Sequence, residues 1–153
     1  KDQIPYTSLR MFNVYGPGQD MSNLRQGMVS IYLSQAMQSG TIQVKGSTDR
    51  FRDFIYIDDV VEAWFAASAI ESDFSQVINV GTGIRTTIQD LLNEICHCLE
   101  KTEFYVDGST LGDQKGIYAD TNRLAENLGL TNFINLSEGI KEFTDSLLEV
   151  KEN

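Results

Sequence analysis

The chain has 153 residues and a formal net charge of −10 at pH 7, a length that suits one domain burying roughly two thirds of its unfolded surface. The acidic balance argues against nucleic acid and anionic membranes as partners, because both are bound by neutralising phosphates with Lys and Arg. No apolar run reaches the roughly twenty residues of a membrane span and no signal-peptide pattern is present, so we expect a soluble, cytoplasmic protein.

The first third of the chain predicts two strands around a helix. Residues 7–14 alternate and are rich in strand-forming side chains, and the turn cluster 15–18 ends them. Apolar residues recur at helical spacing over 26–38, and Gly40 stands where a glycine often follows a helix. Residues 41–45 predict a short second strand.

The middle of the chain predicts strand, helix and strand. Residues 54–57 are extended, and Asp58 or Asp59 is suited to cap a helix that continues to about Ile70. The apolar run 76–81 is typical of a buried parallel strand. The pattern therefore favours an α/β chain.

The last part predicts three helices and a strand. Thr87 and Asp90 resemble a capping pair for a helix over 88–99, and 104–106 reads as a strand. Asp120 is the expected cap of a short helix ending near Gly129, and Ser137 the expected cap of the last helix.

Two segments, 9–14 and 77–80, have the apolar character of strands inside a parallel sheet, yet the chain offers few partners for them. We therefore expect exposed strand edges. Because unpaired edges recruit partners, a homodimer or higher oligomer is predicted.

Two cysteines flank the single histidine in Cys96-His97-Cys98. On a helix, residues two apart point about 200° away from each other, so both thiols could not bind one ion unless the helix broke. We interpret them as helix residues in a reducing cytosol and expect no metal.

Four motifs follow one another along the chain: R-x-x-N-x-Y-G-P at 10–17, R-D-F-I-Y-I-D-D at 52–59, I-N-V-G-T-G at 78–83 and G-D-x5-A-D at 112–120. In this order and spacing, nearly the whole chain resembles the carboxy-terminal part of an extended short-chain dehydrogenase/reductase, in particular the NAD-dependent nucleotide-sugar 4-epimerases and 4,6-dehydratases. The resemblance implies late strands of a Rossmann-type parallel sheet plus a small mixed α/β substrate domain. Residues 1–153 then form one substrate-binding unit, with 1–18 and about 76–101 at the edge of the Rossmann sheet.

The motifs that would hold the cofactor and move protons are missing from the sequence. No G-x-G-x-x-G or G-x-x-G-x-x-G turn is present to bind a dinucleotide pyrophosphate. The family's Tyr-x-x-x-Lys pair, in which lysine and cofactor charge lower the pKa of the tyrosine, is absent as well. We therefore expect NAD in an intact parent enzyme, and neither a cofactor nor a catalytic residue in this fragment.

The resemblance assigns Asn13 to the sugar nucleotide, and Met11 and Phe12 to the neighbourhood of nicotinamide and hexose. From the residues alone, Asn13 follows a strand, where ligands gather in open α/β sheets, and its amide offers both a donor and an acceptor. The alternative is that Asn13 caps the turn at 15–17.

Arg52 is the strongest candidate for a phosphate ligand. A guanidinium matches phosphate oxygens with two parallel hydrogen bonds, and the family counterpart of Arg52 grips the diphosphate. The alternative is an ion pair with Asp53, Asp58 or Asp59. Arg50 could replace Arg52 if the loop register differs, and Asp53 is expected to orient the loop by accepting backbone N–H bonds.

Other residues complete the implied ligand set. Gln43 and Lys45 lie on the strand that runs along the nucleobase, where backbone groups do the recognition, and Gln26 begins a helix on the diphosphate side. Asp113 is suited to ribose hydroxyls, or else to stabilising a turn.

One departure concerns Thr110, because many relatives carry an arginine there. Its loss would weaken diphosphate binding by roughly 1.5–3 kcal/mol unless Arg50 or Arg25 substitutes. The basic residues that could form an anion site fall in the first 85 positions: Arg10, Arg25, Lys45, Arg50, Arg52 and Arg85.

The sequence thus predicts the nucleotide-diphosphate-sugar binding part of an NAD-dependent 4-epimerase, with a UDP- or dTDP-sugar as ligand. In the intact enzyme, hydride would leave sugar C4 and return to its other face. A 4,6-dehydratase or 4-keto-reductase is the alternative within the family. A non-catalytic module that binds a protein through an exposed sheet edge is the alternative from another class.

Overall fold

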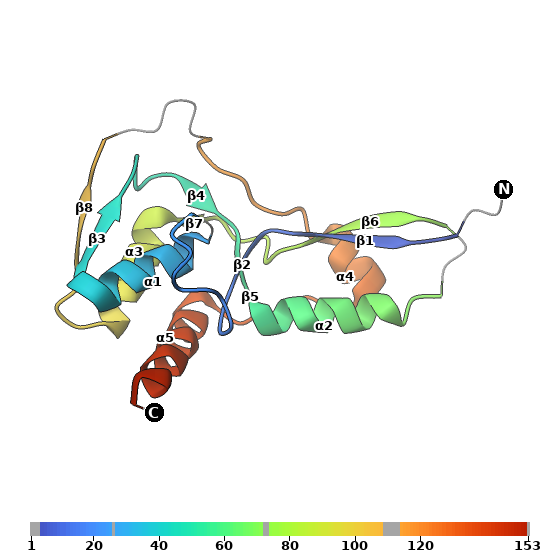
Figure 1. The fold of residues 1–153 in the computed structure, drawn as a ribbon. Coiled ribbons are helices and arrows are strands. Elements are labelled where there is room, and N and C mark those ends of the chain that lie inside the picture. Colours follow the sequence, from blue (N-terminus) through green and yellow to red (C-terminus); the bar gives the residue numbers. More distant parts are fainter. Residues whose placement is uncertain (1–3, 26, 72–73, 109–113, 153) are drawn as a thin grey trace.

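The computed structural model describes residues 4–25, 27–71, 74–108 and 114–152 (Figure 1). Within these ranges eight strands and five helices alternate in an α/β arrangement, as the sequence predicts. The helices are α1 (Met28–Ser39), α2 (Ile57–Ser68), α3 (Ile88–Cys98), α4 (Asn122–Leu128) and α5 (Leu136–Glu152). Among the described helices, none combines the length and apolar character needed to cross a bilayer.

The strands pair two by two. Three pairs are parallel: β1 (Thr7–Met11) with β6 (Gln76–Val80), β2 (Asn13–Tyr15) with β5 (Phe54–Tyr56), and β3 (Thr41–Val44) with β8 (Glu103–Val106). The fourth pair, β4 (Phe51–Arg52) with β7 (Thr86–Thr87), is antiparallel. Parallel neighbours joined through helices are what the alternation of strands and helices favours.

Two apolar cores hold these elements together. Figure 1 shows β1 and β6 side by side at one end of the molecule with α2 and α4 beside them, and β3, β8, α1, α3 and α5 at the other end. The smaller core contains Ile78 and Val80 of β6, Val60 and Ala63 of α2, and Leu124 of α4. The larger core is formed by buried residues that include Leu33, Ile42, Leu92, Ile95, Ile140 and Phe143.

The strand predicted over 7–14 is in fact two strands. The Phe12 N–H donates to the Val80 carbonyl at 3.0 Å, while the Asn13 N–H donates to the Asp53 carbonyl at 3.1 Å. The chain therefore leaves β6 and joins β5 within two residues. The sequence predicted few partners and exposed edges for residues 9–14 and 77–80. Within the described residues each of these strands pairs with one other, β1 with β6 and β2 with β5, in two-stranded sheets.

Several helix ends follow the sequence. Thr87 and Asp90 form the predicted capping box of α3, with the Asp90 N–H donating to Thr87 Oγ1 at 3.0 Å and the Thr87 N–H donating to Asp90 Oδ2 at 3.0 Å. Gly40 and Gly129 both adopt the left-handed conformation, with φ of 68° and 70°, and end α1 and α4. A side chain with a Cβ is strained at such φ values, which explains the two glycines.

Three predicted caps were wrong by one to three residues. The helix α2 begins at Ile57, with Tyr56 as its N-cap, so Asp58 and Asp59 lie inside its first turn. The N-cap of α4 is Thr121, although Asp120 Oδ1 does accept the Asn122 N–H at 3.0 Å. At α5, Asn135 Oδ1 accepts the Glu138 N–H at 3.0 Å, and Ser137 is already helical.

Asp59 is buried at the start of α2, and its Oδ2 accepts the Ile134 N–H at 3.1 Å. Burial raises the pKa of this carboxyl to about 6, and the carboxylates of Glu62, Asp58 and Glu138 act in the same direction. Because the folded pKa lies above the unfolded one, Asp59 adds most stability at low pH. That contribution is lost as pH rises from about 4 to about 6.

We predict that Asp59→Asn stabilises the protein at pH 7.5 by about 1–3 kcal/mol and changes it much less at pH 4.5, since Asn removes a buried charge but keeps an oxygen for Ile134. Urea unfolding at both pH values measures the difference. Asp49→Asn, at an exposed position whose charge is not among those that raise the pKa of Asp59, is the control. An equal gain at both pH values would contradict the prediction.

Candidate functional site: a basic groove organised by a buried carboxylate

Asp53 lies between β4 and β5 and is fully buried. Its carboxylate accepts four hydrogen bonds: from Thr82 N at 2.8 Å, Thr82 Oγ1 at 2.6 Å, Gly83 N at 2.9 Å and Ala119 N at 3.0 Å. These donors compensate for the water that a buried carboxylate loses. The expectation that Asp53 accepts backbone N–H bonds is confirmed, and the carboxylate is engaged by these donors rather than by Arg52.

The glycine of the I-N-V-G-T-G motif is required by the same packing. A Cβ on Gly81 would lie 2.7 Å from Asp53 Oδ2 and 2.7 Å from the Ala119 Cβ, closer than real Cβ contacts. Any side chain at this position would therefore displace the carboxylate or the segment around Ala119. Three of the four sequence motifs thus meet at one buried group.

Asn13 is hydrogen-bonded to the main-chain carbonyl of Asp53. Its backbone N–H and its Nδ2 both donate to the Asp53 carbonyl, at 3.1 and 3.0 Å. The Asn13 side chain therefore ties β2 to the start of β5 rather than capping the turn at 15–17. Met11 and Phe12 precede it along the chain, and Met11 is half exposed at the end of β1.

A groove of about 590 Å³ is lined by residues that include Arg52 of β4. Its basic side chains are Arg25, Lys45, Arg50 and Arg52, and it is otherwise lined by Leu24, Gly27, Met28, Ile31, Tyr32, Gln35 and Gln43. In a chain with a net charge of −10, four cationic side chains in one groove form a local site for an anion.

Main-chain carbonyls orient the two central arginines. Arg50 Nε donates to the Ser47 carbonyl at 2.8 Å, and its Nη2 donates to the Lys45 carbonyl. Arg52 Nη1 donates to the Phe51 carbonyl at 2.7 Å and to the Gln114 carbonyl at 3.3 Å. These bonds help to fix the positions of both guanidinium groups.

The amino terminus of α1 opens onto this groove. Gly27, its N-cap residue, makes no side-chain capping bond, and the first turn contains no acidic residue. A helix start carries a partial positive charge, which favours an anion. The helix start and the four basic side chains thus both favour an anion in the groove.

The predicted ligand residues divide into three groups. Gln43, Lys45 and Arg52 line the groove together with Arg25 and Arg50. Asn13, Met11 and Phe12 lie outside this groove, and Asn13 has the hydrogen bonds given above. Gln26, Thr110 and Asp113 lie outside the described residues.

Gln35 is among the lining residues that were not predicted as site residues from the sequence. It lies in the middle of α1, and its Oε1 accepts the Gln43 N–H at 2.8 Å. A single glutamine within a helix gives no such signal in the sequence, because its contact with Gln43 depends on how α1 packs against β3.

Among the described residues, no group of three His, Cys, Asp or Glu side chains is arranged to hold a metal ion. Cys96 and Cys98 are free thiols, each partly buried on α3. Burial raises the pKa of both thiols.

Comparison with known proteins identifies the family of the chain. The profile of the "NAD dependent epimerase/dehydratase family" matches residues 1–81. A putative UDP-glucose 4-epimerase of Methanocaldococcus jannaschii is 33% identical over 139 residues, which are 90% of this chain and 44% of that protein. A dTDP-L-rhamnose 4-epimerase of Burkholderia thailandensis is 32% identical over 92% of this chain and 39% of its own length.

Among solved structures, the UDP-glucose 4-epimerase of Thermotoga maritima with UDP-glucose superimposes with a TM-score of 0.85 and 30% identity. The match covers 95% of this chain and 47% of that chain. The chain thus spans less than half the length of the relatives it matches.

Replacement of Asp53 tests the organising role of its carboxylate. In Asp53→Asn, an NH₂ group faces donors that the carboxylate accepted, so we predict a loss of roughly 2–4 kcal/mol in the free energy of unfolding. Urea denaturation measures it, with Asp49→Asn at an exposed position as control. A loss no larger than that of the control would show that the four bonds contribute little.

Proposed function

The chain belongs to the NAD dependent epimerase/dehydratase family, and we propose that it is the nucleotide-diphosphate-binding part of a nucleotide-sugar 4-epimerase. The observation that carries the proposal is the groove in which Arg25, Lys45, Arg50 and Arg52 converge on the start of α1. A diphosphate bears charges that this arrangement neutralises, and guanidinium groups bind its oxygens in pairs.

In this proposal Arg52 grips the diphosphate, and Arg50 supplies the second guanidinium that Thr110 does not provide. Two features support this role for Arg50. It lines the groove, and its guanidinium group donates hydrogen bonds to the Ser47 and Lys45 carbonyls. Gln26 and Asp113 remain proposed contacts of the diphosphate and ribose. Lys45 and Gln43 are proposed to run along the base of a UDP- or dTDP-sugar.

Asn13, Met11 and Phe12 are proposed to approach the hexose from the end of β1 and the start of β2. They follow a parallel strand at its carboxyl end, where ligands of open α/β sheets gather. The Asp53 carbonyl fixes the position of the Asn13 amide.

We propose that the turn at 81–83 does not hold the pyrophosphate of NAD. The glycine-containing turn at 81–83 leads from β6 toward α3, and its Thr82 and Gly83 N–H groups already donate to the Asp53 carboxylate. We therefore propose that other parts of a whole enzyme bind NAD, and that this chain binds and orients the sugar nucleotide. A 4,6-dehydratase or a 4-keto-reductase would bind its sugar nucleotide through the same groove.

The test is ligand-observed NMR of the chain with UDP-, dTDP- and GDP-sugars, and with NAD as a control ligand. We expect a sugar nucleotide to bind, and Arg52→Ala to weaken it about 10- to 100-fold through loss of a charge-assisted bond. Arg123→Ala, an exposed arginine outside the groove, should bind as the parent does. Binding of NAD alone, or equal binding by the two variants, would overturn the proposal.

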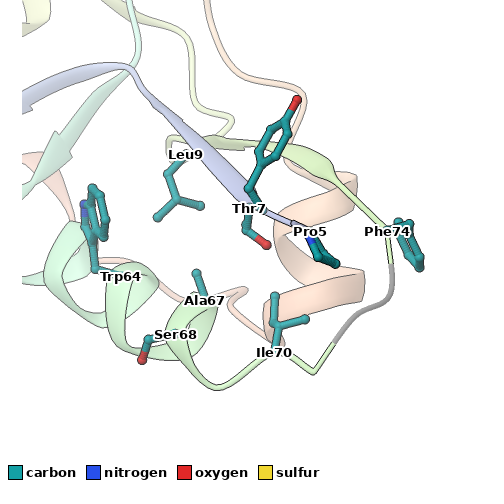
Figure 2. A pocket seen from close by; sticks show the side chains of 9 residues that line it. Pro5, Thr7, Leu9, Trp64, Ala67, Ser68, Ile70 and Phe74 are labelled. Carbon is teal, nitrogen blue, oxygen red and sulfur yellow. The ribbon is translucent and has the colours of Figure 1, made fainter. Parts of the chain in front are cut away.

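A second proposal concerns an apolar face beside β1. Trp64 and Phe65 of α2 are 56% and 73% exposed, and Tyr6 and Phe74 are 61% and 68% exposed. Figure 2 shows Trp64, Leu9, Thr7, Pro5 and Phe74 around a pocket of about 250 Å³ between β1 and α2. Exposed clusters of large apolar side chains mark interaction surfaces, so we propose that a second copy of the chain covers this face.

We predict a mass above that of a monomer in light scattering at high concentration, and a shift to monomer in Trp64→Glu, because a charge at this face opposes its burial. Glu100→Gln, at an exposed position after α3 that does not line this pocket, is the control. A monomeric mass for the parent at all concentrations would contradict the dimer.

A further inference from the structure

One edge of β3 faces the groove, and its polar groups have a fixed order. The Val44 carbonyl accepts the Asp107 N–H at 2.8 Å on the β8 side. Because a trans peptide directs C=O and N–H to opposite sides, the Lys45 N–H points away from β8. In a parallel ladder, successive residues direct their N–H and C=O groups alternately toward and away from the partner strand. The N–H and C=O of Gln43 therefore also point away from β8.

Part of this edge is already occupied. Gln35 Oε1 accepts the Gln43 N–H at 2.8 Å, and Arg50 donates to the Lys45 carbonyl. The amide of Gln35 is thereby oriented: its oxygen is used, and its Nε2 remains as a donor. Among the described residues, none forms a hydrogen bond with Gln35 Nε2, the Gln43 carbonyl or the Lys45 N–H.

The groove thus presents a row of three groups along β3: a donor from Gln35, an acceptor from Gln43 and a donor from Lys45. The complementary ring edge reads acceptor, donor, acceptor. The imide edge of uracil or thymine, O=C–N(H)–C=O, has this order. Cytosine offers acceptor, acceptor, donor, so its ring nitrogen would face the Gln43 carbonyl with two lone pairs opposed.

We propose that Gln35 selects the nucleobase, admitting a uracil or thymine edge and rejecting guanine. This inference rests on the proposed function, because it concerns the base end of the same groove. Guanine matches two of the three positions, with O6 for the Lys45 N–H and N1–H for the Gln43 carbonyl. Its exocyclic amine would then meet Gln35 Nε2, donor against donor, and an unpaired buried donor costs about tenfold or more in affinity.

Inosine diphosphate isolates this third position. Hypoxanthine has the same double ring, O6 and N1–H as guanine but lacks the exocyclic amine. The ratio of GDP to IDP affinity therefore reports on the group that faces Gln35, while ring size and diphosphate charge stay constant.

The experiment is calorimetry of the chain with UDP, IDP and GDP. The parent should bind UDP and prefer IDP over GDP. In Gln35→Glu, one carboxylate oxygen still accepts the Gln43 N–H and the other becomes an acceptor for the guanine amine. We expect the IDP preference to reverse in favour of GDP, and UDP to bind about tenfold more weakly.

Two variants serve as controls. Gln38→Glu adds the same charge to α1 outside the groove lining, so it should lower all three affinities alike, if at all, and keep the IDP preference. Gln35→Met removes both amide groups at similar size. It should bring the GDP and IDP affinities together even if Gln35→Glu fails to fold.

An unchanged GDP to IDP ratio in both Gln35 variants would overturn the role of Gln35. The proposed function would still stand in that case, provided that nucleotides bind and Arg52→Ala weakens them. Failure of the parent chain to bind any of the three nucleotides would overturn the proposed function, and this inference with it.

Discussion

The buried carboxylate of Asp53 is the constraint on which the arrangement of the other parts depends. The carboxylate joins the turn after β6 and the segment at Ala119 to the residue between β4 and β5. The main-chain carbonyl of Asp53 accepts a hydrogen bond from the Asn13 side chain. Removing one buried acceptor leaves several donors unpaired, which is costlier than the loss of any single bond. Arg52 is the residue next to Asp53, so the same network fixes the backbone that carries the guanidinium into the groove.

Charge gives the groove its chemical character. The chain as a whole repels anions, yet Arg25, Lys45, Arg50 and Arg52 converge on one hollow beside a helix start that lacks an acidic residue. Hydrogen bonds to main-chain carbonyls help to orient Arg50 and Arg52. A diphosphate is the kind of ligand that such a positive groove in an acidic chain attracts. In our proposal the edge of β3 adds hydrogen bonds that depend on the base.

Local signals in the sequence predicted the elements well, and long-range contacts account for what was missed. The capping box of α3 and the glycines that end α1 and α4 are encoded within a few residues, so the pattern identified them. The division of residues 7–14 into two strands depends on Val80 and Asp53, far away in sequence, and periodicity does not report such partners. The groove cations could be named from the resemblance, whereas Gln35 could not, because its role arises only when α1 packs against β3.

The most direct test of the central claim is a titration of the ¹⁵N-labelled chain with UDP-glucose, followed by amide chemical shifts. The account predicts that the largest shifts fall on Lys45, Arg50, Arg52 and the side-chain amide of Gln35, and that the indole of Trp64, the single tryptophan, does not move. Shifts gathered around Trp64 and Phe74, or no shifts at millimolar ligand, would contradict a nucleotide-binding groove between α1 and β3.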